Sequence, residues 1–459
     1  MKKSILLLAV LVLMSCLLGA CGKTTGSTGT STGSNATTSG SQSEGEWTFP
    51  TEDITLRWSF WASSEEWPYW GPGIEEFEKM HPNVKFVIET TPWSEYWNKL
   101  STQVASNSQP DITGMTTGTS REYLANGSLL DLTDYMERDS KDPNSGWKTD
   151  NYWPGVFWGY TYKGRIYGVP YDMGPMGICL NLDIFEEFGV DIPDEDWTFD
   201  DMIEIAKKLT VDRDGDGVID VYGLSWTPTD SDFYDNFILS LGSDFVIGEE
   251  PNQTVEVSPI TAECLQKIAD GVREGWNYDK TQAQDLGLFV SGKIAMISAN
   301  PEWFGKYAKL MEKPNLYAMQ APMSGNPKYD TGNKYIGGGG FSIGSNTKYP
   351  EVCWEFLKHY LSEEGVKRTT AIPFRGIPPH KTLMDEFVNS EFAPKNTQAL
   401  LKFMNRENPD NVFFTCPNWN KIRDIMSREL QAVYSGVKTA EEAIDVIVKE
   451  GNRLVREPE

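Results

Sequence analysis

The segment DRDGDGVIDVYG, from Asp212 to Gly223, places four carboxylates within nine residues. Oxygen ligands at alternating positions of a loop, with glycine at the sixth, are typical of a calcium loop of the EF-hand type. Position 12, where such a loop supplies a bidentate glutamate, is Gly223, so we expect a modest affinity near about 10⁻⁴–10⁻³ M. The alternative is a polar turn built on two Asp-Gly steps. The predicted Ca²⁺ ligands are Asp212, Asp214, Asp216, the carbonyl of Val218, and Asp220 directly or through water.

A second chemistry is indicated by the aromatic residues, which include 16 Trp and 19 Tyr in 459 residues. Tryptophan is rarely fully buried and presents a flat apolar face to whatever covers it. Sugars have matching C–H faces, and planar polar side chains such as Asp, Asn, Glu and Arg bind paired hydroxyls. Many of these rings belong to a core, but their number also favours a carbohydrate ligand.

The composition of the chain argues against several other functions. The net charge of −25 argues against nucleic acid or an anionic surface as a partner. Only three His occur, and none forms a zinc-protease motif, so zinc chemistry and His-based nucleophilic catalysis are disfavoured. Four widely spaced cysteines follow the N-terminal region, and their pattern predicts buried thiols while leaving a disulfide open: Cys179, Cys264, Cys353 and Cys416.

The N-terminal region predicts export and anchoring. Residues 1–20 contain two lysines and then the apolar run ILLLAVLVLM, which is typical of a secretory signal peptide. The run ends in LGAC, which resembles the lipobox of bacterial lipoproteins and implies lipidation of Cys21; an ordinary cleavage site is the alternative. Residues 21–46 are rich in Gly, Ser and Thr and predict a flexible tether. We therefore expect a folded body on the extracellular face of the cell membrane, held there through the lipid anchor only.

Strands and helices must alternate to position these groups. TLRWSF, VKFVIE and the segment after PDI are predicted strands, with helices expected over 72–81 and 96–106. The alternation of strands and helices continues later in the chain, where Thr198 is a candidate N-cap for the helix of WTFDDMIEIAKKLT. About 410 residues are too many for one small core, so we predict an α/β protein of two lobes rather than a barrel.

Several blocks, taken in order, resemble the extracellular solute-binding proteins of ABC importers, in the carbohydrate-binding group similar to maltodextrin-binding proteins. They are GRIYGVPYDMGPMGICLNLDIFEEFG with the following DWTFDDMIEIAKKLT, LFVSGKIAMISANPEWF, GGGGFSIGSNTKYPEVCWEFLKHYLSEEG, and the closing KTAEEAIDVIVKEGNRL. The chain departs from the family pattern at Leu180, where Tyr precedes Asn, and at Asn300 or Pro301, where Gly is common. Each motif is loose, but their order and spacing cover nearly the whole chain after the tether.

The resemblance implies a type II periplasmic-binding-protein-like fold: two Rossmann-like lobes joined by hinge crossings, with the ligand between them. Lobe one is expected over 47–172 plus 335–360, and lobe two over 177–322 plus 363–459. Glycines at the crossings, including Gly174 and Gly177, are suited to absorb a closing motion.

Four tryptophans are candidate stacking platforms for a sugar. The resemblance places Trp303 and Trp419 at positions where family members carry a stacking aromatic. Trp61 follows the first strand, where its loop faces the expected cleft, and Trp226 follows the strand of YGLS. Packing in a core is the alternative for each of them.

Polar candidates lie at the same expected cleft. Asp172, at the first crossing, is predicted to accept hydroxyl hydrogen bonds, or else to fix the hinge. Thr117 follows the third strand, Arg375 is a planar donor or a structural ion pair, and Gly339 allows a ligand to approach the backbone.

The function predicted from these features is binding of a sugar, with an oligosaccharide preferred, and its delivery to ABC transporter permease subunits by a monomer that is not an enzyme. Two alternatives stay open. One is the same fold with a non-sugar solute, such as an amino acid, a peptide, a polyamine or a metal ion. The other is a lipid-anchored glycoside hydrolase, which would need two carboxyls about 5–9.5 Å apart.

Overall fold

In this computed structural model the described residues are 47–62, 66–229, 233, 237–242, 245–248, 252–279, 285–329, 337–402, 416 and 418–457. The predicted signal peptide (1–20), Cys21 and the tether (21–46) lie outside them. Residues Thr51–Glu459 form one compact unit. Within the described part of the chain, no helix is both long and apolar enough to cross a membrane.

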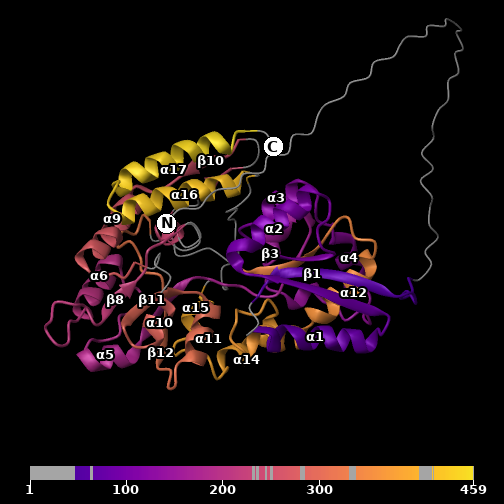
Figure 1. The fold of residues 1–459 in the computed structure, drawn as a ribbon, viewed down its shortest axis with the longest axis horizontal. Helices are drawn as coiled ribbons and strands as arrows, with labels where there is room; N and C mark the ends of the chain where they lie inside the picture. The colour runs from indigo at the N-terminus through magenta and orange to yellow at the C-terminus, as the bar shows by residue number, and fades with distance from the viewer. Residues whose placement is uncertain are drawn as a thin grey trace, which may run out of the picture. The chain divides into compact units, whose positions relative to one another are not determined.

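The first sheet has five strands in the order β2-β1-β3-β13-β6. Two of them, β1 and β3, are labelled in Figure 1. Strand β1 pairs in parallel with β2 and β3, whereas β13 is antiparallel to both β3 and β6. Their bounds are β1 Ile54–Trp61, β2 Val84–Thr91, β3 Ile112–Thr116, β6 Val169–Pro170 and β13 Gly339–Ile343. The helices that belong with this sheet are α1 Trp67–Met80, α2 Trp93–Ala105, α3 Ser120–Ala125, α4 Thr133–Lys141 and α12 Pro350–Tyr360.

An aromatic core holds this sheet to its helices. The indole of Trp58, fully buried on β1, lies 4.8 Å from the ring of Phe341 on β13 and 4.9 Å from Tyr360 on α12. Edge-to-face contacts of this kind add to the free energy of apolar burial. Segments almost 300 residues apart in the sequence are thereby joined in one lobe, as the resemblance implied.

The second sheet has four strands in the order β12-β7-β11-β8. Strand β7 is antiparallel to β11 and β12, and β11 is parallel to β8. The strand bounds are β7 Gly177–Asn181, β8 Tyr222–Ser225, β11 Ile294–Ala299 and β12 Leu316–Gln320. Its helices are α5 Leu182–Phe188, α6 Phe199–Lys208, α9 Pro259–Glu274, α10 Asp285–Val290, α11 Pro301–Leu310, α15 Gln398–Leu401, α16 Trp419–Tyr434 and α17 Ala440–Leu454.

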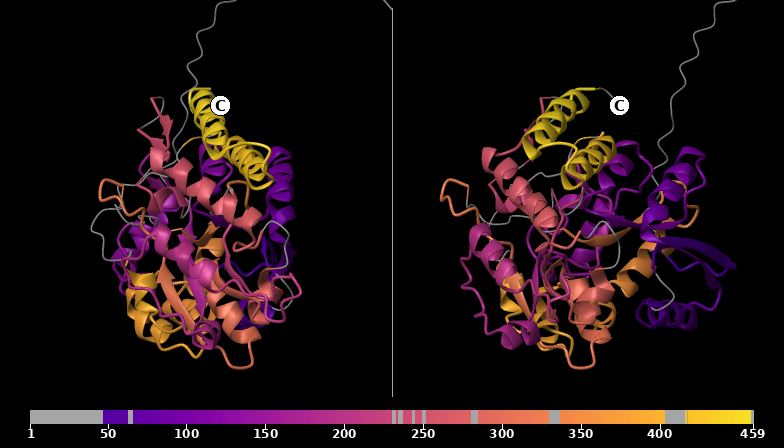
Figure 2. Two further views of the ribbon diagram at one scale, coloured as in Figure 1. Left: turned by 90° about the vertical axis from the view of Figure 1, so that its left-hand side faces the viewer. Right: turned by 60° about the vertical axis from the view of Figure 1, so that its left-hand side comes forward.

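Local signals explain several of these boundaries. Helix α6 begins as predicted at the N-cap Thr198, whose side chain accepts from the backbone N–H of Asp201 while the Asp201 carboxylate accepts from the N–H of Thr198. The same capping box, with Thr439 and Glu442, begins α17. Figure 2 shows α17 lying beside α16 in both of its views.

Short elements complete the described chain: η2 Thr149–Asn151, η3 Trp158–Tyr160, β4 Thr161–Tyr162, β5 Arg165–Ile166, α8 Ile238–Ser240, β9 Phe245–Ile247, β10 Thr254–Glu256, α13 Glu363–Val366, η6 Lys367–Ala371, η7 Lys381–Leu383 and α14 Met384–Val388. All four cysteines outside the N-terminal region are buried. This agrees with the prediction of buried thiols.

The chain passes between the two sheets from β6 to β7 and from β12 to β13, as the two-lobe prediction requires. A third segment, 367–380, contacts elements of both sheets. Arg368 pairs with Glu76 of α1, whereas the carbonyl of Phe374 lies against Gly305 of α11. The predicted lobe boundaries assign this segment to lobe two alone; the strands all fall within their predicted lobes, and the exact boundaries stay a prediction.

Candidate functional site

A cavity of about 530 Å³ is bounded by both sheets' loops and by the crossing segments. Its lining is mixed, with aromatic rings, carboxylates, amides, hydroxyls and guanidinium groups. The lining residues are Trp61, Trp93, Thr116, Gly118, Thr119, Tyr171, Asp172, Gly174, Met176, Asp285, Ser298, Asn300, Glu302, Trp303, Tyr307, Gly338, Gly339, Arg375 and Arg423.

Two tryptophans form the aromatic part of the lining on the side of the first sheet. Trp61 is the last residue of β1, and its ring lies 5.0 Å from that of Trp93, nearly perpendicular to it at 89°. Tyr96 packs on Trp61 at 5.4 Å, and its hydroxyl donates to the carbonyls of Ser59 and Gly114. Trp93 is 45% exposed although its neighbours hold it in place. The pair therefore offers fixed apolar surface to the cavity.

Trp303 supplies the aromatic surface from the second sheet. It lies in the first turn of α11, which follows β11, and its N–H donates to the side chain of the N-cap residue Asn300 at 3.1 Å. The indole is 36% exposed, and the ammonium of Lys306 lies 4.6 Å from its ring centroid. The strand end and the capped turn thus place this ring at the cavity.

Asp172 lies at the crossing between β6 and β7. Its Oδ1 accepts a hydrogen bond of 2.5 Å from the N–H of Gly339, the first residue of β13. Burial, together with the nearby carboxylate of Glu302, raises the pKa of Asp172 to about 7, against the Gly339 N–H and Arg375, which lower it. The carboxyl group is therefore a proton-binding group in the physiological pH range.

Arg375 is held by an ion pair and an aromatic ring. Its Nη2 lies 2.8 Å from Oε1 of Glu66, and its guanidinium stacks over Trp70 at 4.3 Å. Glu302 lies further away, at 4.0 Å. Burial, together with the Glu66 carboxylate, raises the pKa of Glu302, although 44% of its side chain is exposed. Arg375 thus makes a structural ion pair and also lines the cavity, and its role as a donor to a ligand stays a prediction.

Five of the eight predicted ligand-binding residues are brought together at this cavity: Trp61, Asp172, Trp303, Gly339 and Arg375. Trp226 is not among them, since it is fully buried and stacks on Phe199 at 5.5 Å. Trp419 is 1% exposed and packs edge-on against Phe245. A ring without an exposed face offers no stacking platform, so both belong to the core of the second lobe.

Thr117 is also displaced from the predicted position. It is 4% exposed, its N–H donates to the carbonyl of Gly338, and a Cβ on Gly159 would lie 2.4 Å from its methyl group. Its neighbour Thr116 lines the cavity instead. Successive side chains of an extended segment point to opposite sides, so an error of one residue exchanges the two.

Sequence reasoning missed several lining residues. Trp93 directly follows Pro92, and a strand-proline-helix junction at a predicted cleft was the available signal. Glu302 stands one residue before the predicted Trp303. Arg423 comes from α16, one turn after Trp419, so the helix that begins with the predicted Trp419 lines the cavity through a different residue.

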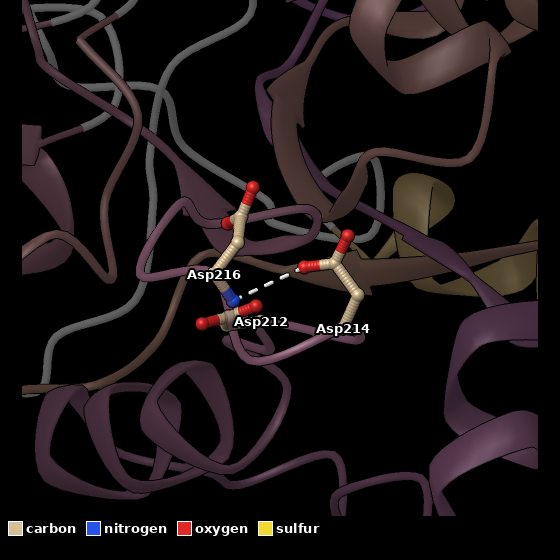
Figure 3. A group of neighbouring side chains, drawn as sticks. All are labelled: Asp212, Asp214 and Asp216. Atoms are coloured by element: carbon tan, nitrogen blue, oxygen red, sulfur yellow. Dashed lines mark hydrogen bonds between the residues drawn. The ribbon is translucent and has the colours of Figure 1, made fainter.

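The acidic loop lies elsewhere, between α6 and β8. Carboxylate oxygens of Asp212, Asp214 and Asp216 lie within 4.8 Å of one another (Figure 3). Each also accepts backbone N–H donors; Asp212 accepts from Gly215 and Gly217, both at 2.8 Å. The Gly217 N–H is the main reason why the pKa of Asp212 lies below its usual range.

The other predicted ligands of this loop are placed differently. Asp220 is not part of the three-carboxylate group, and its Oδ2 accepts from the N–H of Arg213 at 2.8 Å. Val218 is 64% exposed, and its backbone N–H donates to the Asp216 carboxylate at 2.8 Å. Two glycines with positive φ, Gly215 at 77° and Gly217 at 87°, allow the tight turns that bring the aspartates together.

The two sheets, the crossing segments and the cavity among them define a protein of the type II periplasmic-binding-protein-like class, which binds a solute in a cleft. The family model for bacterial extracellular solute-binding proteins matches residues 74–398. The chain belongs to this family.

The individual proteins that match this chain have low sequence identity to it. The sn-glycerol-3-phosphate-binding periplasmic protein UgpB of Agrobacterium fabrum is 24% identical over 344 residues, which cover 72% of this chain and 76% of UgpB. The substrate-binding protein Lmo0181 of Listeria monocytogenes, solved with cycloalternan, has a TM-score of 0.73 at 22% identity, covering 88% of this chain and 99% of its own. Maltose-bound MalE3 of T. maritima has a TM-score of 0.70 at 18% identity, covering 86% and 98%. At these identities the structural likeness establishes the fold alone.

Proposed function

We propose that this protein binds a carbohydrate in the cavity and delivers it to the permease subunits of an ABC importer. The observation that carries this proposal is the composition of the lining, where tryptophan surface from both lobes meets hydrogen-bonding groups on the crossing segments. Apolar faces and closely placed hydroxyls are the two features of a sugar that such a lining complements.

The polar groups of the lining can form hydrogen bonds with the hydroxyls of an uncharged ligand. Asp172 and Glu302 accept hydrogen bonds, Asn300 can donate and accept, and the Arg375 guanidinium donates. The fixed indole of Trp61 and the more exposed indole of Trp303 come from different lobes, so a ligand that contacts both would favour closure.

A phosphate-bearing ligand is less well supported. UgpB is named for glycerol 3-phosphate, and a phosphate needs cationic donors that are not already neutralised. Of the two lining guanidinium groups, Arg375 and Arg423, Arg375 already pairs with Glu66, and the carboxyl groups of Asp172 and Glu302 would repel a phosphate when ionised. A neutral polyhydroxy ligand avoids this repulsion.

A thermal-shift screen followed by calorimetry tests the proposal. Mono- and oligosaccharides, glycerol 3-phosphate, amino acids and polyamines are added to the purified folded body; a ligand at 100 times its Kd stabilises by about 2.7 kcal/mol. We expect a shift with at least one sugar, which Trp303→Ala loses and Trp226→Phe keeps. A shift with glycerol 3-phosphate or a polyamine, and none with sugars, would overturn the choice of ligand.

We further propose that the protein binds and releases its ligand without chemical turnover. A glycoside hydrolase would generate new reducing ends from an oligosaccharide that binds. Incubation with each sugar found in the screen, followed by a reducing-end assay, is expected to give none above the protein-free control. Any turnover that Asp172→Asn abolishes would contradict the binding-only role.

The mode of attachment is also proposed from sequence. We propose that Cys21 is lipidated and holds a monomeric folded body on the extracellular face of the membrane through the 21–46 tether. Metabolic labelling with palmitate is expected to mark the wild type and not Cys21→Ser. Sedimentation of the body from residue 47 onward is expected to give one protomer.

Finally, we propose that the acidic loop holds one structural Ca²⁺. The residues present fit such an ion in part, because three carboxylates converge within 4.8 Å and the Val218 carbonyl is close in sequence. No glutamate stands at the twelfth position of the loop, which supports a modest affinity. The ion would lie on lobe two and would stabilise it without contacting the sugar.

A further inference from the structure

Asp172 lies where three crossing segments meet. Tyr171 N–H donates to the carbonyl of Gly339 at 3.0 Å, and Met173 exchanges two hydrogen bonds of 2.8 Å with Ile377. The Asp172 side chain adds the 2.5 Å bond from the Gly339 N–H. The packing is tight, because a Cβ on Gly376 would lie 2.4 Å from the Cβ of Asp172. One carboxyl group therefore joins the β6–β7 crossing to the start of β13 while it lines the cavity.

Charged and titratable groups approach this carboxyl from several elements. Glu302 comes from α11 and Arg375 from the segment after η6, and both act on Asp172 electrostatically. Two buried phenols, Tyr160 and Tyr171, lie close enough for Asp172 to raise their pKa values. Both therefore stay neutral, so Glu302 is the only acid among these four neighbours that can compete with Asp172 for a proton near neutral pH.

We propose that binding of the carbohydrate releases a proton from Asp172, so that the affinity rises with pH through the neutral range. This inference rests on the proposed function and adds a regulatory property of the same cavity. A ligand hydroxyl donates to the Asp172 carboxylate and keeps its own proton, and the proton that leaves Asp172 passes to the solvent buffer. The hydroxyl stabilises the ionised form of the carboxyl, whereas the protonated form must first lose its proton.

The size of the pH effect on the affinity follows from the linkage between proton binding and ligand binding. In the free protein the pKa of Asp172 lies at about 7. If the bound form has a lower pKa, the affinity falls by up to about tenfold for each pH unit below 7 and is constant above it. The direction is the opposite of that expected if the ligand accepted a hydrogen bond from a protonated Asp172.

The same ionisation acts on the hinge. A carboxylate is a stronger acceptor for the Gly339 N–H than a carboxylic acid, because a charged acceptor makes the shorter and stronger bond. Ionisation by the ligand would therefore tighten the link between the two crossing segments at the moment of binding.

Calorimetry in paired buffers tests the proposal with a sugar found in the screen. At pH 6 we expect close to one proton released per ligand, read from the difference between phosphate and an amine buffer, and close to none at pH 8.5. Across the same range the Kd of the wild type is expected to improve about tenfold or more. A flat Kd without proton release, or uptake of a proton, would overturn the proposal.

Three variants test whether the released proton comes from Asp172. Asp172→Asn is expected to bind more weakly at pH 8.5 and to lose both the pH dependence and the proton release. Glu302→Gln is expected to keep proton release but to move its midpoint to lower pH, since the Glu302 carboxylate raises the pKa of Asp172. Asp445→Asn, which removes an exposed carboxylate of α17, is the matched control and should leave the profile unchanged.

The outcomes also separate this inference from the proposed function. If no carbohydrate binds at any pH, the proposed function fails. If a carbohydrate binds with the same affinity at pH 6 and pH 8.5, only the proton linkage fails. If Glu302→Gln abolishes the proton release and Asp172→Asn retains it, the proton belongs to Glu302 and the assignment to Asp172 is wrong.

Discussion

The cavity and the acidic loop both contain aspartates, and the protein holds these aspartates in opposite environments. Asp172 is enclosed by the crossing segments, and its burial raises its pKa to about 7. Asp212 is exposed on a turn, and backbone N–H groups lower its pKa. A buried acid that is costly to ionise is typical of a site that exchanges partners, whereas exposed carboxylates satisfied by backbone donors form a locally stable turn. The proposed solute site therefore lies at the cavity and not at the more conspicuous motif in the sequence.

Loss of the Trp303 indole is expected to give the largest difference between the two regions, because it should weaken sugar binding at the cavity and leave the acidic loop unchanged. Trp303→Ala removes the exposed ring that α11 presents to the cavity, and we expect the sugar Kd to rise about 100-fold, or about 2.7 kcal/mol. Calorimetry measures the Kd, and calcium titration of the same variant should be unchanged.

The control for this variant is Asp214→Asn, which alters the acidic loop and should leave the sugar Kd within about twofold. The comparison fails if Asp214→Asn weakens sugar binding as much as Trp303→Ala does, because the loop would then contribute to the site.

The pH dependence of stability should have opposite signs in the two regions. The folded protein keeps a proton on Asp172 that the unfolded chain loses above a pKa near 3.8, so this group destabilises the fold as pH rises from about 4 to about 7. Asp172→Asn keeps an acceptor for the Gly339 N–H and should raise the free energy of unfolding by about 2.6 kcal/mol more at pH 8 than at pH 5. Urea unfolding at the two pH values measures this.

Asp212→Asn should act in the other direction. The lowered pKa of Asp212 means that its carboxylate stabilises the folded state above the ordinary pKa and loses that effect as pH falls through the lowered value. The variant is therefore expected to be less stable than the wild type at pH 8. A gain in stability at pH 8 would show that the backbone donors do not stabilise the Asp212 carboxylate.

Much of the fold was predictable from the sequence, because it depends on periodic patterns. The capped helix beginning after Thr198 was predicted from local signals, and the strand and turn leading to Trp303 were predicted from the family resemblance. Trp226 and Trp419 were misassigned because their burial is decided by distant partners, Phe199 for one and Phe245 for the other. A sequence motif places a tryptophan on an element but does not tell which neighbours will cover its face.

The site was predictable where a residue was fixed by its place in the chain. Asp172 was identified because a carboxylate at a hinge crossing is hard to explain as core. Glu66 and Arg375 could not be paired from sequence, since 309 residues separate them and only the fold brings them to 2.8 Å. Trp93 was missed although its strand-proline-helix junction was a signal in the sequence; its ring contact with Trp61 is known only from the fold.

Calcium should change the stability of the protein and leave its affinity for the sugar unchanged. At a Ca²⁺ concentration tenfold above its Kd, the folded protein gains about 1.4 kcal/mol, which EDTA removes. Differential scanning calorimetry is expected to show this shift in the wild type and not in Asp214→Asn, while the sugar Kd is the same with Ca²⁺ and with EDTA. Loss of sugar binding in EDTA with unchanged stability would contradict a purely structural ion.

The smallest expected effect concerns closure of the cavity. The side-chain amide of Asn420, in the first turn of α16, donates to the carboxylate of Glu122 on α3, a contact between elements of the two lobes. Because both side chains are only partly buried, we expect Glu122→Ala to cost about 0.5 kcal/mol, a two- to threefold weaker sugar Kd.

Calorimetry of Glu122→Ala should therefore be compared with Glu137→Ala, which truncates an exposed carboxylate on α4 and should change nothing. The calcium response, which depends on a turn far from this contact in the sequence, should be identical in both variants. If Glu122→Ala binds sugar as the wild type does, the contact between α3 and α16 does not stabilise the ligand-bound arrangement. If it also weakens the calcium response, the acidic loop and the cavity are coupled, and the separation drawn between them is wrong.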